Sequence, residues 1–392
     1  MSEWIETTVG DVATVFDGPH ATPKKIEEGP WFLSISSLNK GRLNLAESAH
    51  VSEEDFRQWT RRVTPREGDV LFSYETRLGE AAAMPPKVQA CLGRRMGLLR
   101  PKPGRVDPRF LLYAYLGPEF QETIAARTIH GATVDRIPLA TMPTWPIHLP
   151  KLADQRAIVS VLGALDDKIE VNERITGTAE ALALALAAEG KWEGRTRLTD
   201  LCTLRKDQVS PQEITDDFVD HYSLPAFDAG KLPERAAPQS IKSGKFLISE
   251  PAVLLSKLNP DIPRVWNVTP ESNVLSLAST EFLVLTPRGQ LSTHELWAVT
   301  AQHAFLDDLA SKVTGTSKSH QRVRPAEVLE SKVIDPRQFG ETGSGIRSLA
   351  NRAALARQES QALAALRDTL LPQLMSGRLR VKDAEKIVED HA

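Results

Sequence analysis

The sequence contains very little cysteine, and its histidines are dispersed. Cys91 and Cys202 are the only two cysteines among 392 residues, and neither has a CxxC partner. The nine histidines show no spacing typical of a metal-ligand cluster. These absences argue against a zinc site or a disulfide framework, and the few cysteines suit a reducing cytoplasm.

Long apolar runs are also missing. No window approaches the roughly 18 apolar residues that a membrane-spanning helix needs. Residues 1–6 lack the basic and apolar regions of a secretory signal peptide. We therefore expect a cytoplasmic protein that is not secreted and has no membrane partner.

The chain has no excess of positive charge. Its 48 lysines and arginines are offset by 51 aspartates and glutamates, which leaves a formal net charge of −3. This balance provides no overall positive field that would attract nucleic-acid phosphates. If the chain binds nucleic acid, its basic residues must therefore be concentrated locally.

The motifs of common nucleotide-binding and hydrolytic enzymes are absent as well. There is no GxxxxGK[ST] phosphate loop, no GxGxxG segment after a strand and no HExxH pair. The Asn-Pro-Pro-aromatic box of amino-methyltransferases is missing too. Its nearest counterpart, Asn259-Pro260-Asp261, lacks the second proline and the aromatic residue. We therefore expect a chain without catalytic residues.

What the chain does contain is a weak internal repeat. Three segments of the first half recur in the second half, in the same order and at a nearly constant offset. Ordered matches at one offset are stronger support than any one of them, because each alone is ordinary strand or turn sequence. The matched pairs are residues 9–13 with 198–202, residues 68–73 with 252–256, and residues 131–138 with 315–325.

Each copy ends in a segment with the pattern of a long helix. Residues 154–188 contain no proline, and their apolar residues alternate in steps of four and three along one face. Asp154 can cap the start of this helix, and Gly190 and Gly194 mark its end. The sequence therefore predicts one uninterrupted helix after the first copy.

A second long helix is expected from about residue 344 to residue 375, where Ser376 and Gly377 stop it. About 35 residues at about 1.5 Å each give a helix of roughly 50 Å, which is longer than a small domain is wide. One such helix would ordinarily belong to a globular core, but a pair favours an antiparallel coiled coil. The apolar seam residues are Ile158, Leu162, Leu165 and Ile169 in the first helix and Leu349, Ala353, Ala356, Leu363, Leu366 and Leu370 in the second.

The rest of each half mixes strand-like and helix-like segments. This mixture predicts an α+β fold, with two globular domains in tandem pseudo-repeat separated by the antiparallel helix pair. Strands are expected at residues 31–35, 70–72, 253–255 and 281–285, and helices at residues 107–115 and 293–309. The expected boundaries are residues 1–150 for the first domain, 151–190 for the first helix, 191–340 for the second domain, and 341–392 for the second helix and C-terminal tail.

Polar loops beside the predicted strands contain the candidate binding residues. Hydroxyl, amide and cationic side chains can donate hydrogen bonds to phosphates or base edges. A polar loop is more often simply solvated, but these loops recur at equivalent places in both copies. The candidates are Ser36, Asn39, Lys40, Arg42, Ser73, Tyr74, Thr76, Arg77, Thr133 and Arg136 in the first copy, and Ser256, Lys257, Asn259, Arg264, Thr316, Ser317, Lys318, Gln321 and Arg322 in the second.

Four segments resemble a known protein family, the specificity subunit of type I restriction–modification systems. Residues 149–175 look like the start of its first spacer helix, and residues 370–381 look like its closing signature. Residues 68–73 and 315–322 are similar to patterns inside its recognition domains. In that family each of two target-recognition domains is followed by a long helix, and the two helices form a spacer. This chain departs from the family's symmetry, because its second helix lacks the Gln-Arg opening of the first and follows a Gly-rich segment.

The resemblance implies a non-catalytic subunit that binds double-stranded DNA. Each recognition domain would read one half of a bipartite target, and the helix pair would set the gap between the halves. Lysine and arginine side chains would contact phosphates, while Asn, Gln, Ser, Thr and some Arg side chains would read base edges. No cofactor and no metal are expected on this chain.

The resemblance also implies partner subunits. Two methyltransferase subunits would use S-adenosylmethionine to methylate adenine, and restriction subunits would use ATP and Mg²⁺. Two alternatives stay open: a helical scaffold that binds proteins, and the recognition part of a single-chain restriction–methylation enzyme, for whose catalytic block this chain has no room. The helix residues expected to bind partners or form the spacer are Gln155, Arg156, Ile158, Leu162, Leu165, Ile169, Leu363, Leu366, Leu370 and Leu374.

Overall fold

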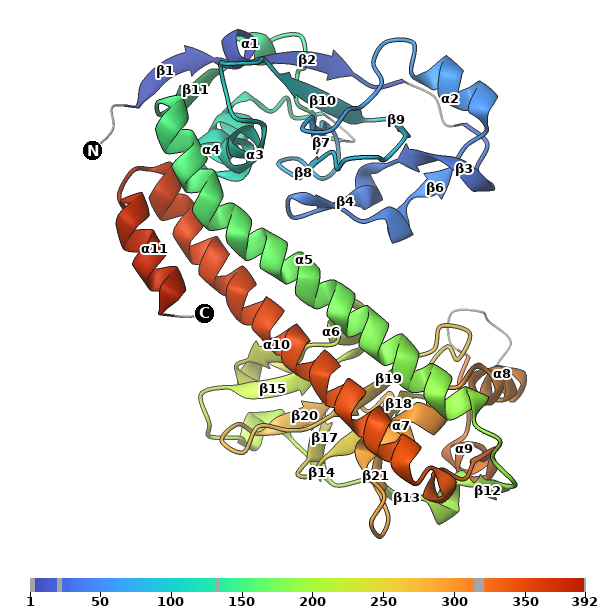
Figure 1. Cartoon of the computed structure of the whole chain (residues 1–392). Coiled ribbons are helices and arrows are strands. Elements are labelled where there is room, and N and C mark those ends of the chain that lie inside the picture. Colours follow the sequence, from blue (N-terminus) through green and yellow to red (C-terminus); the bar gives the residue numbers. More distant parts are fainter. Residues whose placement is uncertain (1–3, 20–22, 132–133, 314–320, 391–392) are drawn as a thin grey trace. The chain divides into compact units, whose positions relative to one another are not determined.

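Two compact units make up the protein. The first comprises Met1–Val171 and Glu359–Ala392, and the second comprises Asn172–Gln358. Among the described residues, no helix has the length and apolar character of a membrane span. The structure is a computed structural model that describes residues 4–19, 23–131, 134–313 and 321–390 (Figure 1).

The centre of the first unit is a four-stranded antiparallel sheet. Its strands are β2 (Ala13–Asp17), β7 (Val70–Ser73), β8 (Ala81–Ala83) and β10 (Met96–Pro101). In space they are ordered β2-β10-β7-β8. Every residue of β7 is buried, as its uninterrupted apolar run predicts.

Smaller sheets surround this central sheet. One sheet has the order β6-β3-β9, one hairpin joins β4 to β5, and one antiparallel pair joins β1 to β11. The last pair brings the start of the chain next to the segment that leads into the first long helix. The strands are β1 (Ile5–Thr8), β3 (Ile26–Leu33), β4 (Leu38–Asn39), β5 (Arg42–Leu43), β6 (Ala49–His50), β9 (Ala90–Leu92) and β11 (Pro146–Leu149).

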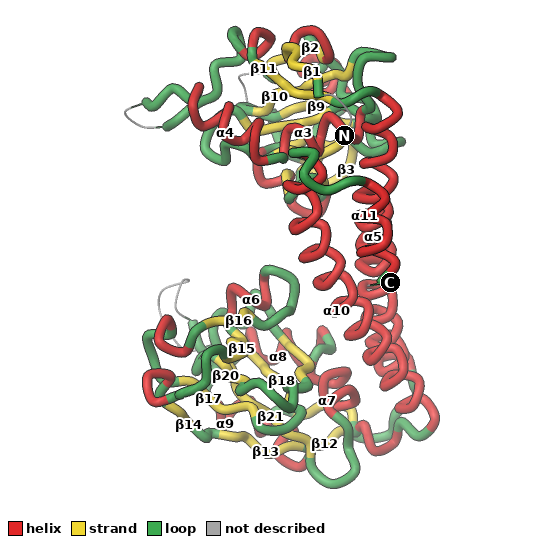
Figure 2. Tube along the Cα trace, turned by 90° about the vertical axis from the view of Figure 1, so that its left-hand side faces the viewer, coloured by secondary structure: helices red, strands yellow, loops and turns green. Residues whose placement is uncertain are grey.

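The short helices of the first unit are α1 (Val9–Val12), α2 (Glu53–Trp59), α3 (Pro108–Leu116) and α4 (Pro118–Arg127). Figure 2 shows α3 and α4 next to the strands. Asp107 begins α3, because its carboxylate accepts hydrogen bonds from the backbone N–H groups of Arg109 and Phe110 at 3.0 and 3.1 Å. Most of α3 is buried, so it forms the apolar layer between the sheet and the long helices.

The second unit contains the same central sheet. Its strands β13 (Cys202–Arg205), β18 (Ala252–Ser256), β19 (Val265–Val268) and β21 (Phe282–Pro287) have the order β13-β21-β18-β19, which repeats β2-β10-β7-β8. A five-stranded sheet accompanies it, with β14 (Gln208–Val209), β17 (Lys245–Ile248), β20 (Ser276–Ala278), β15 (Val219–Tyr222) and β16 (Glu234–Ala236) in that order. An outer pair, β12 (Arg195–Arg197) with β22 (Lys332–Ile334), corresponds to β1 with β11.

The helices of the second unit complete the repeat. They are α6 (Leu224–Asp228), α7 (Thr293–Thr300), α8 (His303–Ser311) and α9 (Pro325–Glu330). Helices α7 and α8 follow the central sheet in the chain as α3 and α4 do in the first unit. The predicted α+β pseudo-repeat is therefore confirmed, and the matched segments 68–73 and 252–256 fall on the equivalent strands β7 and β18.

Two long helices each contribute to both units. Helix α5 (Leu152–Glu189) has 38 residues and α10 (Glu341–Met375) has 35. In the first unit Asp166 and Lys168 pair with Arg367 and Glu359, so rising numbers on α5 meet falling numbers on α10. In the second unit the Thr176 hydroxyl donates to the carbonyl of Ala353. The predicted antiparallel packing is confirmed, and α11 (Val381–Glu389) follows α10 as a short C-terminal helix.

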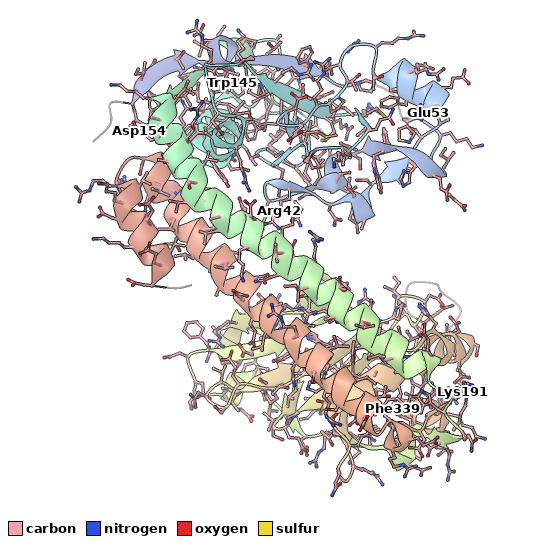
Figure 3. All side chains as sticks on the ribbon, in the orientation of Figure 1. Arg42, Glu53, Trp145, Asp154, Lys191 and Phe339 are labelled. Atoms are coloured by element: carbon pink, nitrogen blue, oxygen red, sulfur yellow. The ribbon has the colours of Figure 1, made fainter. Side chains whose placement is uncertain are left out.

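Several predicted boundaries were wrong. Helix α5 begins at Leu152, so Asp154 lies in its first turn, where a carboxylate favours the helix dipole, and not at the cap (Figure 3). The helix expected at residues 293–309 is two helices, separated at residues 301–302. The Gly-rich segment before the second long helix is itself helical from Glu341. Glycine is needed at position 343 because a side chain there would clash with the Glu295 carboxylate on α7.

Two half-buried histidines are expected to make the second unit less stable at acidic pH. Burial lowers the pKa of His294, and burial together with Lys245 lowers the pKa of His221 below the ordinary 6.5. The folded unit therefore binds these protons less readily than the unfolded chain. We expect its free energy of unfolding to be greatest above pH 6.5 and to fall as the pH drops through the lowered pKa values.

The slope of that loss has an upper bound of about 1.4 kcal/mol per pH unit for each histidine. Denaturant unfolding at several pH values between 7 and 5, monitored by hydrogen exchange of the second unit, measures this slope. A chain with both histidines replaced by glutamine should show a shallower slope over this range. An identical slope in both chains would contradict the assignment.

Candidate nucleic-acid interface

The strands β7 and β18 end in the same kind of turn. After β7, the buried Ser73 hydroxyl donates to the carbonyl of Glu75, and the next residue, Thr76, has φ 71°. After β18, the Ser256 hydroxyl donates to the carbonyl of Leu258 at 3.0 Å, and the next residue, Asn259, has φ 48°. Few non-glycine residues adopt this left-handed conformation, and they concentrate at functional sites. The two copies therefore repeat an unusual local geometry.

An exposed arginine lies across each turn. In the first unit Arg136 forms a β-bridge with Glu75, and in the second unit Arg322 forms a β-bridge with Leu258. The residue after each arginine then donates its backbone N–H to the chain beside the turn, Ile137 to Tyr74 at 2.8 Å and Val323 to Lys257 at 3.0 Å. Arg136 and Arg322 thus occupy equivalent places.

An acidic group pairs with an arginine near each turn, but only in the second unit is that arginine the one that lies across the turn. In the first unit Arg95 pairs with Glu75 at 2.7 Å. In the second unit Arg322 donates two hydrogen bonds to Glu281, at 2.9 and 3.1 Å, and this pairing outweighs burial and lowers the pKa of Glu281. The Arg322 side chain is still 45% exposed, so its orientation is fixed while it stays accessible to a ligand.

Other candidates lie on neighbouring loops of the first unit. Ser36, Asn39 and Lys40 are exposed, and Lys40 has φ 44° at the tip of the β4–β5 hairpin. Arg77 is also exposed, although it donates to the carbonyl of Ile35 at 3.2 Å. The contact with Ile35 places Arg77, the residue after Thr76, next to the loop that contains Ser36.

Burial corrects the expectation for several candidates. The side chains of Ser73, Tyr74 and Ser256 are buried, so we assign them to holding the turns and not to direct contact with DNA. Arg264 is only 12% exposed and makes a two-point pair with Asp228 at 2.7 and 2.8 Å, which is a structural contact. Arg42 donates to the carbonyl of Asp166 on α5 and is likewise directed toward the helix.

The remaining candidates of the second unit are divided. Lys257 and Gln321 are half-buried, and the Gln321 carbonyl accepts a hydrogen bond from the backbone N–H of Asn259 at 2.8 Å. Gln321 therefore helps to shape the turn. Thr133, Thr316, Ser317 and Lys318 lie outside the residues that the structure describes.

Sequence reasoning missed the charged residues that face the turns. Glu75 follows one predicted strand and Glu281 begins another, but nothing in their local sequence indicates an arginine partner. Arg95 becomes the partner of Glu75 because β10 pairs with β7, which brings these two residues, 20 positions apart, next to the same turn. Only this strand pairing could identify it.

The helix residues expected to bind partners or form the spacer differ in exposure. Gln155 is 2% exposed, and its amide accepts from the backbone N–H of Asp107 and donates to the carbonyl of Pro150, both at 2.9 Å, so it connects α3 to α5. Arg156 is exposed. The seam residues are buried or half-buried in the core of the first unit, and form the helix seam and not an outer surface: Ile158, Leu162, Leu165, Ile169, Leu363, Leu366, Leu370 and Leu374.

The outer faces of the helices contain different apolar residues. Val171 is 46% exposed and Leu182 48% exposed on α5, and Leu355 is 60% exposed on α10. Sequence periodicity could have identified them, because they fall between the seam positions.

Comparison with known proteins agrees with this geometry. Residues 1–181 match the family described as the type I restriction modification DNA specificity domain. The match covers 181 of the 392 residues. The matched residues contain the turn after β7, Arg136 and most of α5.

Two known proteins are similar to this chain, one over less than half of its length and one over nearly all of it. A protein of Methanocaldococcus jannaschii named as the MjaX type I restriction enzyme specificity subunit is 24% identical over 185 residues, which cover 44% of this chain and 42% of that protein. The match thus spans less than half of that relative's length. The crystal structure of a type I restriction–modification S subunit from M. genitalium has a TM-score of 0.57 at 15% identity and covers 95% of this chain and 96% of that chain. This second likeness shows that the fold is shared.

Proposed function

We propose that this chain is the DNA-binding specificity subunit of a type I restriction–modification complex. In this role it reads a bipartite target and directs adenine methylation and restriction by partner subunits, without catalysing either. The observation that supports it best is the repeated turn, with a left-handed residue and an exposed arginine at equivalent places in both units. Two copies of one recognition device suit a target with two halves.

The two turns have different chemistry, which favours two different half-sites. Asn259 in the second turn has a half-buried amide whose Oδ1 is shielded from solvent, whereas the exposed Thr76 in the first turn has one hydroxyl and a methyl group. An arginine fork such as that of Arg136 or Arg322 suits guanine or phosphate. The proposed target is therefore asymmetric.

The partners and cofactors follow from the proposed role. Two methyltransferase subunits would dock on the outer faces of α5 and α10, where Val171, Leu182 and Leu355 expose apolar side chains. Restriction subunits would complete the complex. S-adenosylmethionine, ATP and Mg²⁺ belong to these partners, this chain holds no cofactor, and the complex acts in the cytoplasm.

Long-read methylation sequencing of host DNA, with and without the gene for this chain, tests the proposal. Loss of one split adenine-methylated motif on deletion would support the specificity role and identify the target. Restoring the chain should restore that motif. An unchanged methylome, with the methyltransferase partner expressed in both strains, would overturn the proposal.

Salt dependence distinguishes the alternative of a protein-binding scaffold. A DNA-reading complex releases counterions from phosphates, so its affinity for DNA falls steeply as salt rises. If this chain is only a protein-binding scaffold, the complex assembled with its partners would show no such salt-dependent binding to DNA.

A further inference from the structure

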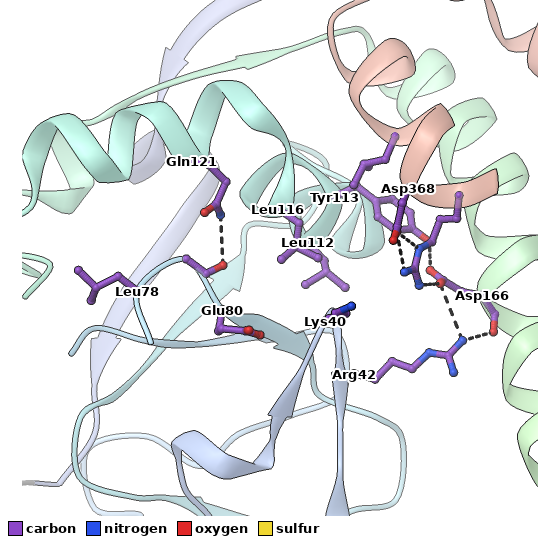
Figure 4. A pocket seen from close by; sticks show the side chains of 14 residues that line it. Lys40, Arg42, Leu78, Glu80, Leu112, Tyr113, Leu116, Gln121, Asp166 and Asp368 are labelled. Carbon is purple, nitrogen blue, oxygen red and sulfur yellow. Dashed lines mark hydrogen bonds and ion pairs between the residues drawn. The ribbon is translucent and has the colours of Figure 1, made fainter. Parts of the chain in front are cut away.

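One carboxylate of α5 connects three elements of the first unit. Asp166 accepts hydrogen bonds from the Tyr113 hydroxyl on α3 at 2.6 Å and from Arg367 on α10 at 2.8 Å (Figure 4). Arg42, from the β4–β5 hairpin, donates to the backbone carbonyl of the same residue and lies 3.8 Å from its carboxylate. The β4–β5 hairpin, α3 and both long helices therefore meet at Asp166. We call the sheets and short helices of each unit, without α5, α10 and α11, its recognition fold.

This junction is largely shielded from water. The side chains of Arg367 and Asp166 are 13% and 14% exposed, and that of Arg42 is 28% exposed. A cavity of about 360 Å³ lies beside them, lined in part by Lys40 and Leu112. Burial and the neighbouring Asp166 raise the pKa of Tyr113, so its hydroxyl remains a donor. Shielded, charge-assisted contacts of this kind hold a defined geometry.

The second unit contains the same arrangement with different residues. Glu180 on α5 accepts from Arg357 on α10 at 2.6 Å and from Lys231 of the recognition fold at 2.9 Å. All three side chains are less than 30% exposed. Burial alone would raise the pKa of Glu180, but the two cations outweigh it and lower that pKa. The carboxylate is therefore charged and shared at neutral pH.

The repetition itself is informative. In both units an α5 carboxylate is shared between an α10 arginine and a cation of the recognition fold. In both units that cation comes from a turn that contains a lysine with left-handed backbone conformation. In the first unit this lysine is Lys40, two residues before Arg42, and in the second unit it is Lys231, which is itself the cation. Ion pairs that exchange water for protein contacts add little net stability, but they restrict geometry. A device that recurs in both units is thus better explained by orientation than by stability.

We propose that Asp166 and Glu180 are positioning residues that hold each recognition fold at one angle on its helix pair and so set the gap length that the chain accepts. The inference rests on the proposed function. A recognition fold that tilts on its helices moves its base contacts along the DNA, and a displacement of about 3.4 Å corresponds to one base pair. Releasing either carboxylate therefore broadens the range of gaps.

Gap discrimination by the assembled complex tests this inference. The full chain is reconstituted with its methyltransferase subunits, and methylation rates are measured on the native motif and on motifs with one base pair more or less in the gap. We expect D166N and E180Q each to reduce the preference for the native gap about tenfold, as expected for one lost charge-assisted contact. Base preference within each half-site should stay unchanged.

Matched variants separate orientation from folding. E170Q neutralises an exposed carboxylate on the same helix and should keep the native gap preference. D166E should restore most of the preference that D166N loses. If D166N fails to fold, R42Q and K231Q give the same test, because they leave the pairs between α5 and α10 intact.

The outcomes are distinguishable. If the wild-type complex discriminates between gap lengths and the folded variants discriminate equally well, this inference is overturned but the proposed function is not. A wild-type complex that methylates no split motif would overturn the proposed function, and this inference with it.

Discussion

Replacing Trp145 with alanine is expected to unfold the first unit under conditions in which the unsubstituted chain is folded. Trp145 has no exposed surface and packs near Phe120, with ring centroids 6.3 Å apart (Figure 3). Its backbone carbonyl also accepts from the N–H of Val9 at 2.9 Å. Removing a fully buried tryptophan costs about 3–5 kcal/mol, which is a large share of the roughly 5–15 kcal/mol of a typical domain.

Hydrogen exchange measures this loss within the first unit alone. A single global unfolding transition would instead combine the stabilities of the two units. Protection of β7 and α3 should fall sharply in W145A, while strands of the second unit keep theirs. The control is W31A, which removes a half-buried tryptophan from β3 in the β6-β3-β9 sheet. This substitution should lower the free energy of unfolding by about 1 kcal/mol. Equal protection in the two variants would show that Trp145 is not central to the core.

Replacing Arg136 with alanine is expected to weaken binding of the target by the assembled complex about 10- to 100-fold, the range for a lost arginine contact to a base. Arg322→Ala should have a smaller effect, because Glu281 already balances that charge. Since the two arginines belong to different units, each substitution should relax the sequence preference in a different half-site. If Arg136 contacts phosphate instead, affinity falls for all sequences and the salt slope falls by about 1.

Titrations of the complex with native and half-site-altered DNA, each at several salt concentrations, separate these effects. Arg57→Ala removes another exposed arginine, on α2, and should leave both affinity and salt slope unchanged. If R136A behaves like R57A, then the turn after β7 is not part of the interface.

Local and repeated features were predictable from the sequence. The seam of Ile158, Leu162 and Leu165 predicted α5 because helical periodicity is written along the chain itself. The matched segments 68–73 and 252–256 predicted the pseudo-repeat because equivalent buried strands need equivalent apolar runs. Errors were confined to boundaries, as at Asp154, where cap and first-turn positions favour the same residue types.

The candidate site was predictable only in outline. Sequence reasoning placed polar loops after the correct strands, and Thr76, Arg136, Asn259 and Arg322 do lie at the two turns. It could not separate them from Ser73, whose hydroxyl looks equally available in the sequence but is buried. Exposure depends on what packs over a residue, and that is not a local property.

The sequence by itself determined the two long helices, the duplicated α+β fold and the loops that contain the candidate binding residues, because periodicity and repetition are properties of neighbouring residues. Only the tertiary structure decided the partners of the charged groups. Arg42 meets Asp166 across 124 positions, and Glu281 meets Arg322 across 41. Such pairs form where strand pairing and helix packing bring distant segments together, and no spacing within the sequence encodes that proximity.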